Sequence, residues 1–448
     1  MARAVLILAA CLAVAVNPAA QPPNAGDLNA LHALLEANKG QSIHLPAGHY
    51  RMDRPLVITT DDTVLHGQAV IIQTNPDADI LRIENAKGVR ISGLTLKRET
   101  GRAESTASGI RAENCARLDI DGVRVIDNWS QAGTIHLDRC SSSSVRRSEV
   151  LNYKRIGVDD RTASELYGYA FRVIDGTGIL VTHSDGIQIQ DNRVIEERLY
   201  PTRETKERYQ LGDFTDGSQP LKKGRLAPPG TYANNWHQGS AITVTSPEST
   251  RHVLISGNLI RNAAQGIDMH CDNVTCSNNV IDHAFLGIKC MHGSRCVIIA
   301  NNTVTHMDLW GLVMLPGVLS HPAQSPDDDR PARGPNYTRG NIIANNIFSD
   351  FGFGHEYYNW EDSTGRVISL ESGQLPENPV MTDVLVVGNI VYDAGADKLL
   401  VDGTPQTVPP RYKFAVYLDT NPPPQGIVFR NNILHPGSEG VSNVPIGE

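Results

Sequence analysis

The chain has 448 residues and a formal net charge of −9, which argues against nucleic acid as a partner because phosphate binding requires a basic surface. Aromatic residues make up only 6% of the sequence while 39 residues are glycine, a balance that fits a turn-rich β protein and not a helical bundle. A chain of this length usually contains two or three domains, but elongated β architectures can extend further as one domain.

The first residues have the pattern of a secretory signal peptide. Arg3 precedes an apolar run over residues 4–16, and small residues follow this run. We therefore expect residues 1–20 to be a signal peptide. Residues 21–448 then form one secreted or periplasmic domain.

One alternative at this end is a lipoprotein box, because "LAAC" ends at Cys11. The apolar run continues past this cysteine, which favours cleavage over lipidation. The run is also too short to span a bilayer, and no later segment is apolar for long enough to form a transmembrane helix.

A short apolar pattern recurs through the rest of the chain. Six segments share the form V/I-x-I/V-x-x-N-x-I/V, some of them loosely, with Asn258, Asn279, Asn302, Asn346, Asn389 and Asn432 at the Asn position. "IQIQDNRVI", with Asn192, belongs to the same set, and earlier segments carry Leu94, Val123 and Ser148 there. The first three asparagines are 21 and 23 residues apart, whereas the later gaps of about 43 indicate inserted loops or a degenerate coil.

A repeat of this length with one apolar alternation predicts a solenoid, in which each alternation is a strand with one face turned inward. The repeated Asn can stack on its neighbours at a turn, where its backbone tolerates the left-handed conformation. Neither the pattern of leucine-rich repeats nor the 3.6-residue period of helical repeats occurs. We predict an all-β fold, a single right-handed parallel β-helix over about residues 40–435, with long inserts at about 196–238, 316–338 and 349–382.

The first predicted coil, "SIHLPAGHYRMDRPLVI" (42–58), resembles the lead-in coil of the pectin-lyase-like β-helix superfamily. The resemblance covers the chain from about residue 40 onward and implies the same fold. That superfamily contains polysaccharide lyases, polygalacturonases, uronan C5-epimerases, fructan-converting enzymes and phage tailspikes. The resemblance therefore implies a carbohydrate substrate and leaves the reaction open.

One motif resembles a catalytic motif of polygalacturonases. "HSDGIQI" (183–189) is similar to their Asn-Thr-Asp-Gly-Ile, which would make Asp185 a catalytic carboxylate. The Asp-Asp, Gly-His-Gly and Arg-Ile-Lys motifs that follow in those enzymes are absent here, as are the signature motifs of the epimerases and of the calcium pectate lyases. The alternative, which the missing motifs favour, is that Asp185 is a turn residue before a strand.

A second short strand follows a glycine in most coils, and these strands align in columns. One column reads Arg111, His136, Leu180, Thr243, Asp268, Lys289 and Val313, and the column two residues further reads Glu113, Asp138, Thr182, Thr245, His270, Met291 and Leu315. The residues between the columns are apolar and should point inward, because successive side chains of a strand alternate between its faces. With neighbouring strands about 4.8 Å apart, Asp268 should lie beside Lys289 with His270 close to both.

Such a cluster has the groups that a uronate lyase needs. His270 can remove H5 as a general base, with Asp268 holding its tautomer, while Lys289 steadies the substrate carboxylate or acts as the base itself. The alternative is a row of stacked Asp and Lys side chains on the surface, in which the histidine has no catalytic role. If the cluster is catalytic, replacing His270 or Lys289 by alanine should remove most activity, and we expect thermal stability to change little because outward residues do not hold the core.

The inserts can supply walls and sugar-binding side chains, since long loops on a compact scaffold are usually functional. The expected partner is an extracellular polysaccharide, possibly an acidic one, and the sequence does not predict an oligomeric state. The substrate-binding residues that we predict are His237, His292, Trp236, Arg155, Asp185, Tyr357 and Trp360.

The cysteines suit an oxidising exterior. Cys115 and Cys140 each follow an aligned Ile by five residues, so we predict that they stack in neighbouring coils and form a disulfide. We predict no metal ligands and no cofactor. Calcium remains an alternative, because "PDDDR" (326–330) and the pair Asp159 and Asp160 offer carboxylates.

The functional prediction is thus a polysaccharide lyase. Alternatives are a glycoside hydrolase, which would need two carboxylates on either side of the bond, a C5-epimerase, or a passive carbohydrate-binding or adhesin β-helix. Long inserts of mixed charge argue against the passive fibre, which should have short turns and uniform outward columns.

Overall fold

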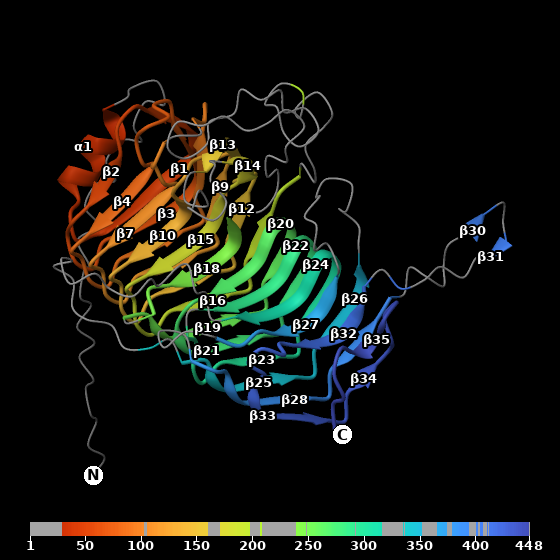
Figure 1. Cartoon of the computed structure of the whole chain (residues 1–448). Coiled ribbons are helices and arrows are strands. Elements are labelled where there is room, and N and C mark those ends of the chain that lie inside the picture. The colour runs from red at the N-terminus through yellow and green to blue at the C-terminus, as the bar shows by residue number, and fades with distance from the viewer. Residues whose placement is uncertain are drawn as a thin grey trace, which may run out of the picture.

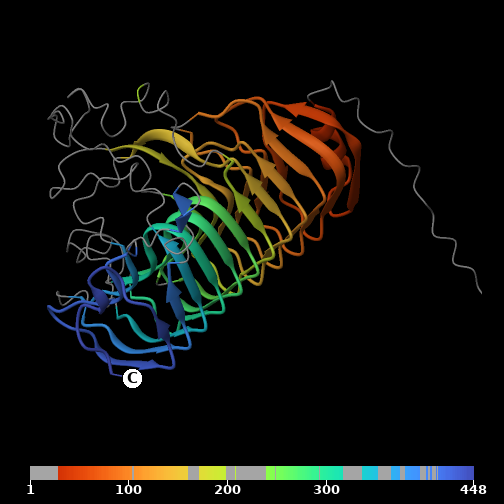
Figure 2. The ribbon, with the colours of Figure 1, turned by 90° about the vertical axis from the view of Figure 1, so that its right-hand side faces the viewer.

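The computed structural model describes residues 29–102, 105–159, 171–197, 207, 239–247, 249–291, 293–315, 335, 337–351, 365–373, 379–393, 400–401, 404–405, 410 and 412–447. These residues form one right-handed parallel β-helix, as the sequence predicts, with the chain rising coil by coil from its N-terminal to its C-terminal end (Figures 1 and 2). The predicted signal peptide and most of the three inserts lie outside the described residues.

Each coil contributes strands to three faces, and strands of successive coils pair in parallel on each face. Five long strands bend around a corner and contribute to two faces each. They are β1 (Ser42–Met52), β3 (Val64–Gln73), β20 (Leu259–Met269), β22 (Val280–Met291) and β24 (Thr303–Leu315).

Face 1 carries the predicted site. Its strands are the ends of β20, β22 and β24 together with β2 (Leu56–Ile58), β4 (Leu81–Glu84), β7 (Ile110–Glu113), β10 (Gly133–Asp138), β15 (Thr177–Thr182), β18 (Ser240–Thr245), β27 (Arg366–Leu370), β32 (Phe414–Leu418) and β35 (Gly440–Ser442).

Face 2 follows face 1 along each coil. Its strands are the starts of β1 and β3 together with β5 (Arg90–Ser92), β8 (Asp119–Asp121), β11 (Ser144–Arg146), β16 (Gln188–Gln190), β19 (Arg251–Ser256), β21 (Asp272–Ser277), β23 (Ile298–Ala300), β25 (Arg339–Ala344), β28 (Thr382–Val387) and β33 (Gln425–Arg430).

Face 3 closes each coil. Its strands are the ends of β1 and β3 and the starts of β20, β22 and β24, together with β6 (Thr95–Arg98), β9 (Arg124–Ile126), β12 (Glu149–Leu151), β17 (Arg193–Ile195), β26 (Ile347–Phe351), β29 (Ile390–Tyr392) and β34 (Ile433–Leu434).

One helix and two antiparallel strand pairs lie outside the faces. The helix α1 (Ala30–Ala37) sits at the N-terminal end of the β-helix (Figure 1), and β13 (Arg155–Asp159) pairs antiparallel with β14 (Phe171–Asp175) in an excursion from the coils. A second antiparallel pair is made by β30 (Leu400–Val401) and β31 (Thr404–Pro405).

A ladder of buried asparagines runs along the turn between faces 2 and 3. The Oδ1 atom of Asn279 accepts the backbone N–H of Asn258 at 3.0 Å and its Nδ2–H at 2.9 Å, and Asn302 does the same for Asn279. The predicted stacking of these residues is therefore confirmed. The left-handed backbone falls on the residue before each ladder asparagine, such as Asn278 (φ 57°), and not on the ladder residue as the sequence suggested.

The core is one continuous apolar column inside the coils. The residues that the alignment turns inward on face 1 are fully buried, and they are Ala112, Leu137, Val181, Val244, Met269, Cys290 and Met314. This alternation is the reason that the register of the strands is well defined, since a slip by one residue would expose this set. Among the described residues no helix has the length and apolar character needed to cross a membrane.

Candidate active site

The strand register on face 1 reproduces the predicted column. Arg111 pairs with His136, and the following partners along the face are Leu180, Thr243, Asp268, Lys289 and Val313. Asp268 near the end of β20 therefore stands directly beside Lys289 near the end of β22. The sequence predicted this arrangement because β20 and β22 are separated by a repeat without an insert.

Asp268 connects His270 and Lys289. Its Oδ1 atom lies 2.6 Å from Nε2 of His270, and its Oδ2 atom accepts a hydrogen bond of 3.2 Å from Nζ of Lys289. Gln265, at the corner of the same strand, accepts a second bond of 3.0 Å from Nζ, and Thr245 places its hydroxyl 3.2 Å from Nδ1 of His270. One carboxylate thus fixes both an imidazole and an ammonium group.

The three polar side chains are much less exposed than the sequence suggested. Their side-chain exposures are 9% for Asp268, 13% for His270 and 15% for Lys289. Burial by itself raises the pKa of the Asp268 carboxyl, but attraction to His270 and Lys289 outweighs burial and holds that pKa well below its usual range. Asp268 is therefore an ionised orienting group near neutral pH.

This arrangement suits a general base held by a carboxylate. With Nε2 directed to Asp268, the proton of a neutral His270 belongs on Nε2, which leaves Nδ1 as the basic nitrogen. The Nζ atom of Lys289 is held at the same carboxylate, one strand further along the face. Base and cation are thereby held by the two oxygens of one carboxylate.

Of the predicted substrate-binding residues, Asp185 lies in a different part of the coil. It precedes β16 on face 2, and its carboxylate accepts 2.9 and 2.8 Å bonds from Arg251 and His252 of the next coil. These partners lower the pKa of Asp185, with His252 the larger influence. The structure thus brings Asp185 into a turn between coils and not beside Asp268.

The other predicted binding residues are described only in part or not at all. Arg155 begins β13, where it pairs with Asp175 in the backbone ladder. His237, His292, Trp236, Tyr357 and Trp360 lie outside the described residues. So do residues 326–330 and Asp160, and the side chain of Asp159 is not described either, so the alternative of a calcium site is untested.

The predicted disulfide between Cys115 and Cys140 is wrong, because both are free thiols in the structure. The two cysteines do stack in neighbouring coils, in the turns that follow β7 and β10, but their sulfurs are not joined. Each thiol instead donates to backbone carbonyls. Cys115 bonds the carbonyl of Ile83 at 3.4 Å, and Cys140 bonds that of Ala112 at 3.7 Å.

A second polar cluster lies on face 1, at the end of β10. Asp138 accepts bonds of 2.8 Å from both Thr182 and His183, and Thr182 also lies 3.0 Å from Nε2 of His136. Burial, followed by the nearby charge of Arg111, lowers the pKa of His136 to about 4. Because His136 and Asp138 occupy the predicted columns three coils before Asp268 and His270, the cluster is a separate polar group on the same face.

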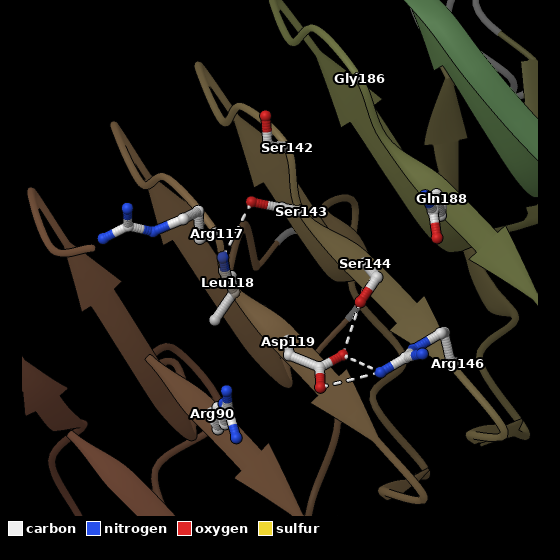
Figure 3. A pocket seen from close by; sticks show the side chains of 10 residues that line it. All are labelled: Arg90, Arg117, Leu118, Asp119, Ser142, Ser143, Ser144, Arg146, Gly186 and Gln188. Carbon is white, nitrogen blue, oxygen red and sulfur yellow. Dashed lines mark hydrogen bonds and ion pairs between the residues drawn. The ribbon is translucent and has the colours of Figure 1, made fainter. Parts of the chain in front are cut away.

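A hollow with a volume of about 420 Å³ lies on face 2. Figure 3 shows Asp119 bonded to Ser144 and doubly to Arg146 of the next coil, with Arg117 on the same coil as Asp119 and Arg90 on the coil before. This hollow is on different strands from Asp268. It is therefore separate from the site of His270 and Lys289.

The sequence analysis missed one cluster of potential metal ligands, formed by Asp282, His283 and His306. His283 and His306 are 23 residues apart, the same spacing as Asn279 and Asn302, so aligning the repeats by their asparagines would have placed the two histidines together. The column alignment started at the glycine before each face 1 strand and left this corner out.

Comparison with known proteins gives structural matches only. No protein-family model matches the sequence, and a search of curated proteins finds no significant match. Among solved structures, an exopolygalacturonase from Thermotoga maritima matches with a TM-score of 0.52 and 11% identity over 82% of this chain and 83% of its own. The A-module of the mannuronan C-5 epimerase AlgE4 from Azotobacter vinelandii matches with a TM-score of 0.51 and 12% identity over 94% and 93%.

A third structure, the Agl-KA catalytic domain, matches with a TM-score of 0.53 and 11% identity, and the alignment covers 92% of this chain and 63% of that one. At these identities the matches establish architecture and not activity. Together with the stacked strands of three faces and the asparagine ladder, they establish that the chain shares the right-handed parallel β-helix fold of these proteins.

Proposed function

We propose that this protein is a secreted enzyme that cleaves a uronate-containing polysaccharide by β-elimination at Asp268, His270 and Lys289. The observation that carries the proposal is the single carboxylate that holds an imidazole at 2.6 Å and an ammonium at 3.2 Å on adjacent coils. Two proteins with the same fold are named for acting on a polygalacturonate and on mannuronan, and these names set the substrate class to be tested first.

His270 is the proposed base. Asp268 holds Nε2 and so directs the basic Nδ1 toward the hydroxyl of Thr245. Removal of H5 from a uronate unit by Nδ1 produces an imidazolium, which the ionised Asp268 stabilises across the short bond. The carboxylate thus fixes the tautomer before the reaction and offsets the charge that forms during it.

Lys289 is the proposed electrostatic partner of the substrate carboxylate. When H5 leaves as a proton, its electron pair delocalises into the carboxyl group, whose negative charge increases in the transition state. Two N–H groups of Nζ are donated to Asp268 and Gln265, which leaves a third N–H for the substrate. An ammonium that is already oriented in a nearly buried site stabilises this charge more than one in water.

The step closes when the glycosidic oxygen O4 leaves. The electron pair from C5 forms the C4–C5 double bond, the C4–O4 bond breaks, and the proton now on His270 passes to O4. A single imidazole can perform both transfers when H5 and O4 lie on the same side of the ring, as in D-mannuronate and D-glucuronate units. In D-galacturonate they lie on opposite sides, so we expect it to be the poorer substrate.

Distances along face 1 disfavour a hydrolase that would use Asp268 and Asp138 as its two carboxylates. The strand that carries Asp138 is three strand steps from the strand that carries Asp268. At about 4.8 Å per step, the two carboxylates are separated by at least about 14 Å. Hydrolases need carboxyl groups about 5–9.5 Å apart. An epimerase would need a further proton donor on the opposite side of the sugar ring, whereas elimination from a same-side unit needs only His270.

The test is the ultraviolet absorbance of the unsaturated product, followed with polymannuronate, polyglucuronate and polygalacturonate. We expect wild-type protein to produce it from at least one of the first two polymers. His270→Gln, which can retain the bond to Asp268, and Lys289→Met should each lose about 10²–10⁴-fold in rate. Arg193→Ala, an exposed change on face 3, is the matched control and should act like wild type.

Each contrary result has a definite meaning. New reducing ends without ultraviolet absorbance would show a hydrolase, and incorporation of solvent deuterium at C5 without chain cleavage would show an epimerase. Folded wild-type protein that changes none of the three polymers, or a His270→Gln variant as active as wild type, would overturn the proposal.

A further inference from the structure

The corner between faces 3 and 1 carries a line of residues in the left-handed conformation. Asn262, His283, His306 and Asp350 occupy it in successive coils, with φ angles of 62°, 58°, 60° and 58°. Asp282 lies immediately before His283, and the strand register pairs it with Thr305, immediately before His306. Three side chains that can bind metal therefore meet at the point where β22 and β24 bend.

The potential ligand atoms of these three side chains lie close together, and we call the three residues the corner cluster. Oδ1 of Asp282 lies 3.1 Å from Nδ1 of His283 and 2.7 Å from Nδ1 of His306. The two imidazole rings stack with centroids 4.5 Å apart and an angle of 7° between their planes. All three donor atoms lie within 4.8 Å of one another.

Other carboxylates on the coils also contact a histidine from the left-handed position of the next coil. Asp138 contacts His183 and Asp185 contacts His252, each at 2.8 Å. In both pairs one imidazole meets the carboxylate. In the described part of the chain, only the corner cluster brings two imidazoles to the same carboxylate oxygen, although Arg261 already bonds the other oxygen of Asp282 at 3.1 Å.

We propose that the corner cluster binds one transition-metal dication of the zinc type, through Nδ1 of His283, Nδ1 of His306 and a carboxylate oxygen of Asp282. A tetrahedral Zn²⁺ with bonds of about 2.0–2.1 Å holds its donor atoms about 3.3 Å apart. The contacts of 2.7 and 3.1 Å from Asp282 need to open by less than about 1 Å to reach this spacing.

The donor set selects the class of metal. Two imidazoles and one carboxylate suit Zn²⁺, Ni²⁺ or Cu²⁺, whereas Ca²⁺ and Mg²⁺ require mostly oxygen donors. The side chains are 20–31% exposed, so the fourth position is within reach of water. The three ligands come from two coils, and the metal would therefore link the coil of β22 to that of β24.

The corner cluster is separate from the site on face 1. Lys289 lies six residues after His283 along β22, which corresponds to about 20 Å of extended strand. Binding at the corner cluster should therefore stabilise the fold without being needed for the elimination. A ligand that binds the folded state and not the unfolded state raises the unfolding temperature by mass action. This effect does not depend on the proposed enzymatic function.

The experiment is calorimetric titration of tag-free, chelator-treated full-length protein with ZnCl₂. We expect one Zn²⁺ per chain and a higher melting temperature on binding. His283→Asn and His306→Asn should each weaken binding at least about tenfold, since each removes one of three ligands. Asparagine tolerates the left-handed backbone, as Asn262 shows in the same line.

His183→Asn and His252→Asn, which alter the single-histidine pairs, are the matched controls and should bind Zn²⁺ as wild type does. Absence of saturable Zn²⁺ binding by wild type, undiminished binding by both corner variants, or equal binding of CaCl₂ would each overturn the proposal. If the variants do not fold, footprinting of the histidines of wild type with diethyl pyrocarbonate tests whether the corner cluster binds the metal. Zn²⁺ should protect His283 and His306 from modification, and lack of protection would contradict the site.

Discussion

Asp268 shows how neighbours can reverse the effect of burial on one residue. Its side chain is 9% exposed, a position that would favour the neutral acid, yet its bonds to His270 and Lys289 keep it ionised. The sequence predicted these neighbours correctly. It also suggested that replacing them would hardly affect stability, which does not follow for charges that are this buried.

We expect Lys289→Met to lower the free energy of unfolding by about 2–4 kcal/mol, because it leaves a buried carboxylate without its cation. The double variant Asp268→Asn with Lys289→Met should lose less than the sum of the single losses, since neither charge then remains unpaired. Urea denaturation of the four proteins gives the coupling energy. Strictly additive losses would show that the two charges do not stabilise each other.

His136 should make stability depend on pH. Its pKa in the folded protein is about 4, below the unfolded value of about 6.5, so the unfolded chain binds a proton more readily. The stabilising contribution is complete above pH 6.5 and is lost as the pH falls toward 4, by about 1–3 kcal/mol. Between about pH 6.5 and about pH 4, the free energy of unfolding of His136→Gln should fall less than that of wild type. The control His49→Gln, which changes an exposed histidine, should lose as much stability as wild type over this range.

At the scale of the element, the backbones of the coils that carry the site stack so closely where the chain enters face 1 that only glycine fits there. Gly266, Gly287 and Gly311 lie in successive coils, within β20, β22 and β24 and just before their face 1 segments. A Cβ atom on Gly266 would lie 2.5 Å from the carbonyl oxygen of Gly287, and one on Gly287 would lie 2.4 Å from that of Gly311. The glycine that marks each face 1 strand in the sequence is thus a requirement for packing.

We expect Gly287→Ala to destabilise the protein by about 3 kcal/mol, because the clash is with backbone that cannot move without shifting the next coil. The added methyl would also meet Val304 at 2.4 Å. Gly447→Ala, where nothing lies within 4 Å, is the control and should be neutral. Melting temperatures of the two variants provide the comparison, and a stable Gly287→Ala protein would contradict the stacking.

At the scale of the whole molecule, a solenoid has an exposed end that must be covered. Leu31 and Leu35 of α1 are buried in the same apolar cluster as the first coils. A β-helix without such a cover presents apolar side chains and unpaired strand edges to other chains. The helix is therefore a cap for the N-terminal end (Figure 1).

Leu35→Asp should lower the melting temperature and promote aggregation, because it places a charge against the core and loosens the cap. Ala33→Asp on the exposed side of the same helix should change neither property. Light scattering during a thermal ramp measures both effects. Equal behaviour of the two variants would show that α1 does not cap the core.

The order of the strands and the pairing of Asp268 with Lys289 could be read from the sequence because neighbours in this fold are one repeat apart along the chain. Apolar alternation then decides which side chains point inward, and equal spacing decides which residues stack, as in Asn279 with Asn302. Both signals come from neighbouring repeats, so they can be read without knowing the structure of the inserts. The prediction was therefore most accurate between residues 258 and 302, where successive repeats are uninterrupted.

Side-chain direction and depth depended on the folded coils. Cys115 and Cys140 stack as predicted, yet parallel neighbours turn their sulfurs to backbone carbonyls, so a matching position did not imply a bond. The convergence of His283 and His306 on Asp282 likewise requires the bend between faces 3 and 1, where a left-handed residue redirects each side chain. A repeat specifies which residues are neighbours, whereas the backbone at each corner decides whether their atoms meet.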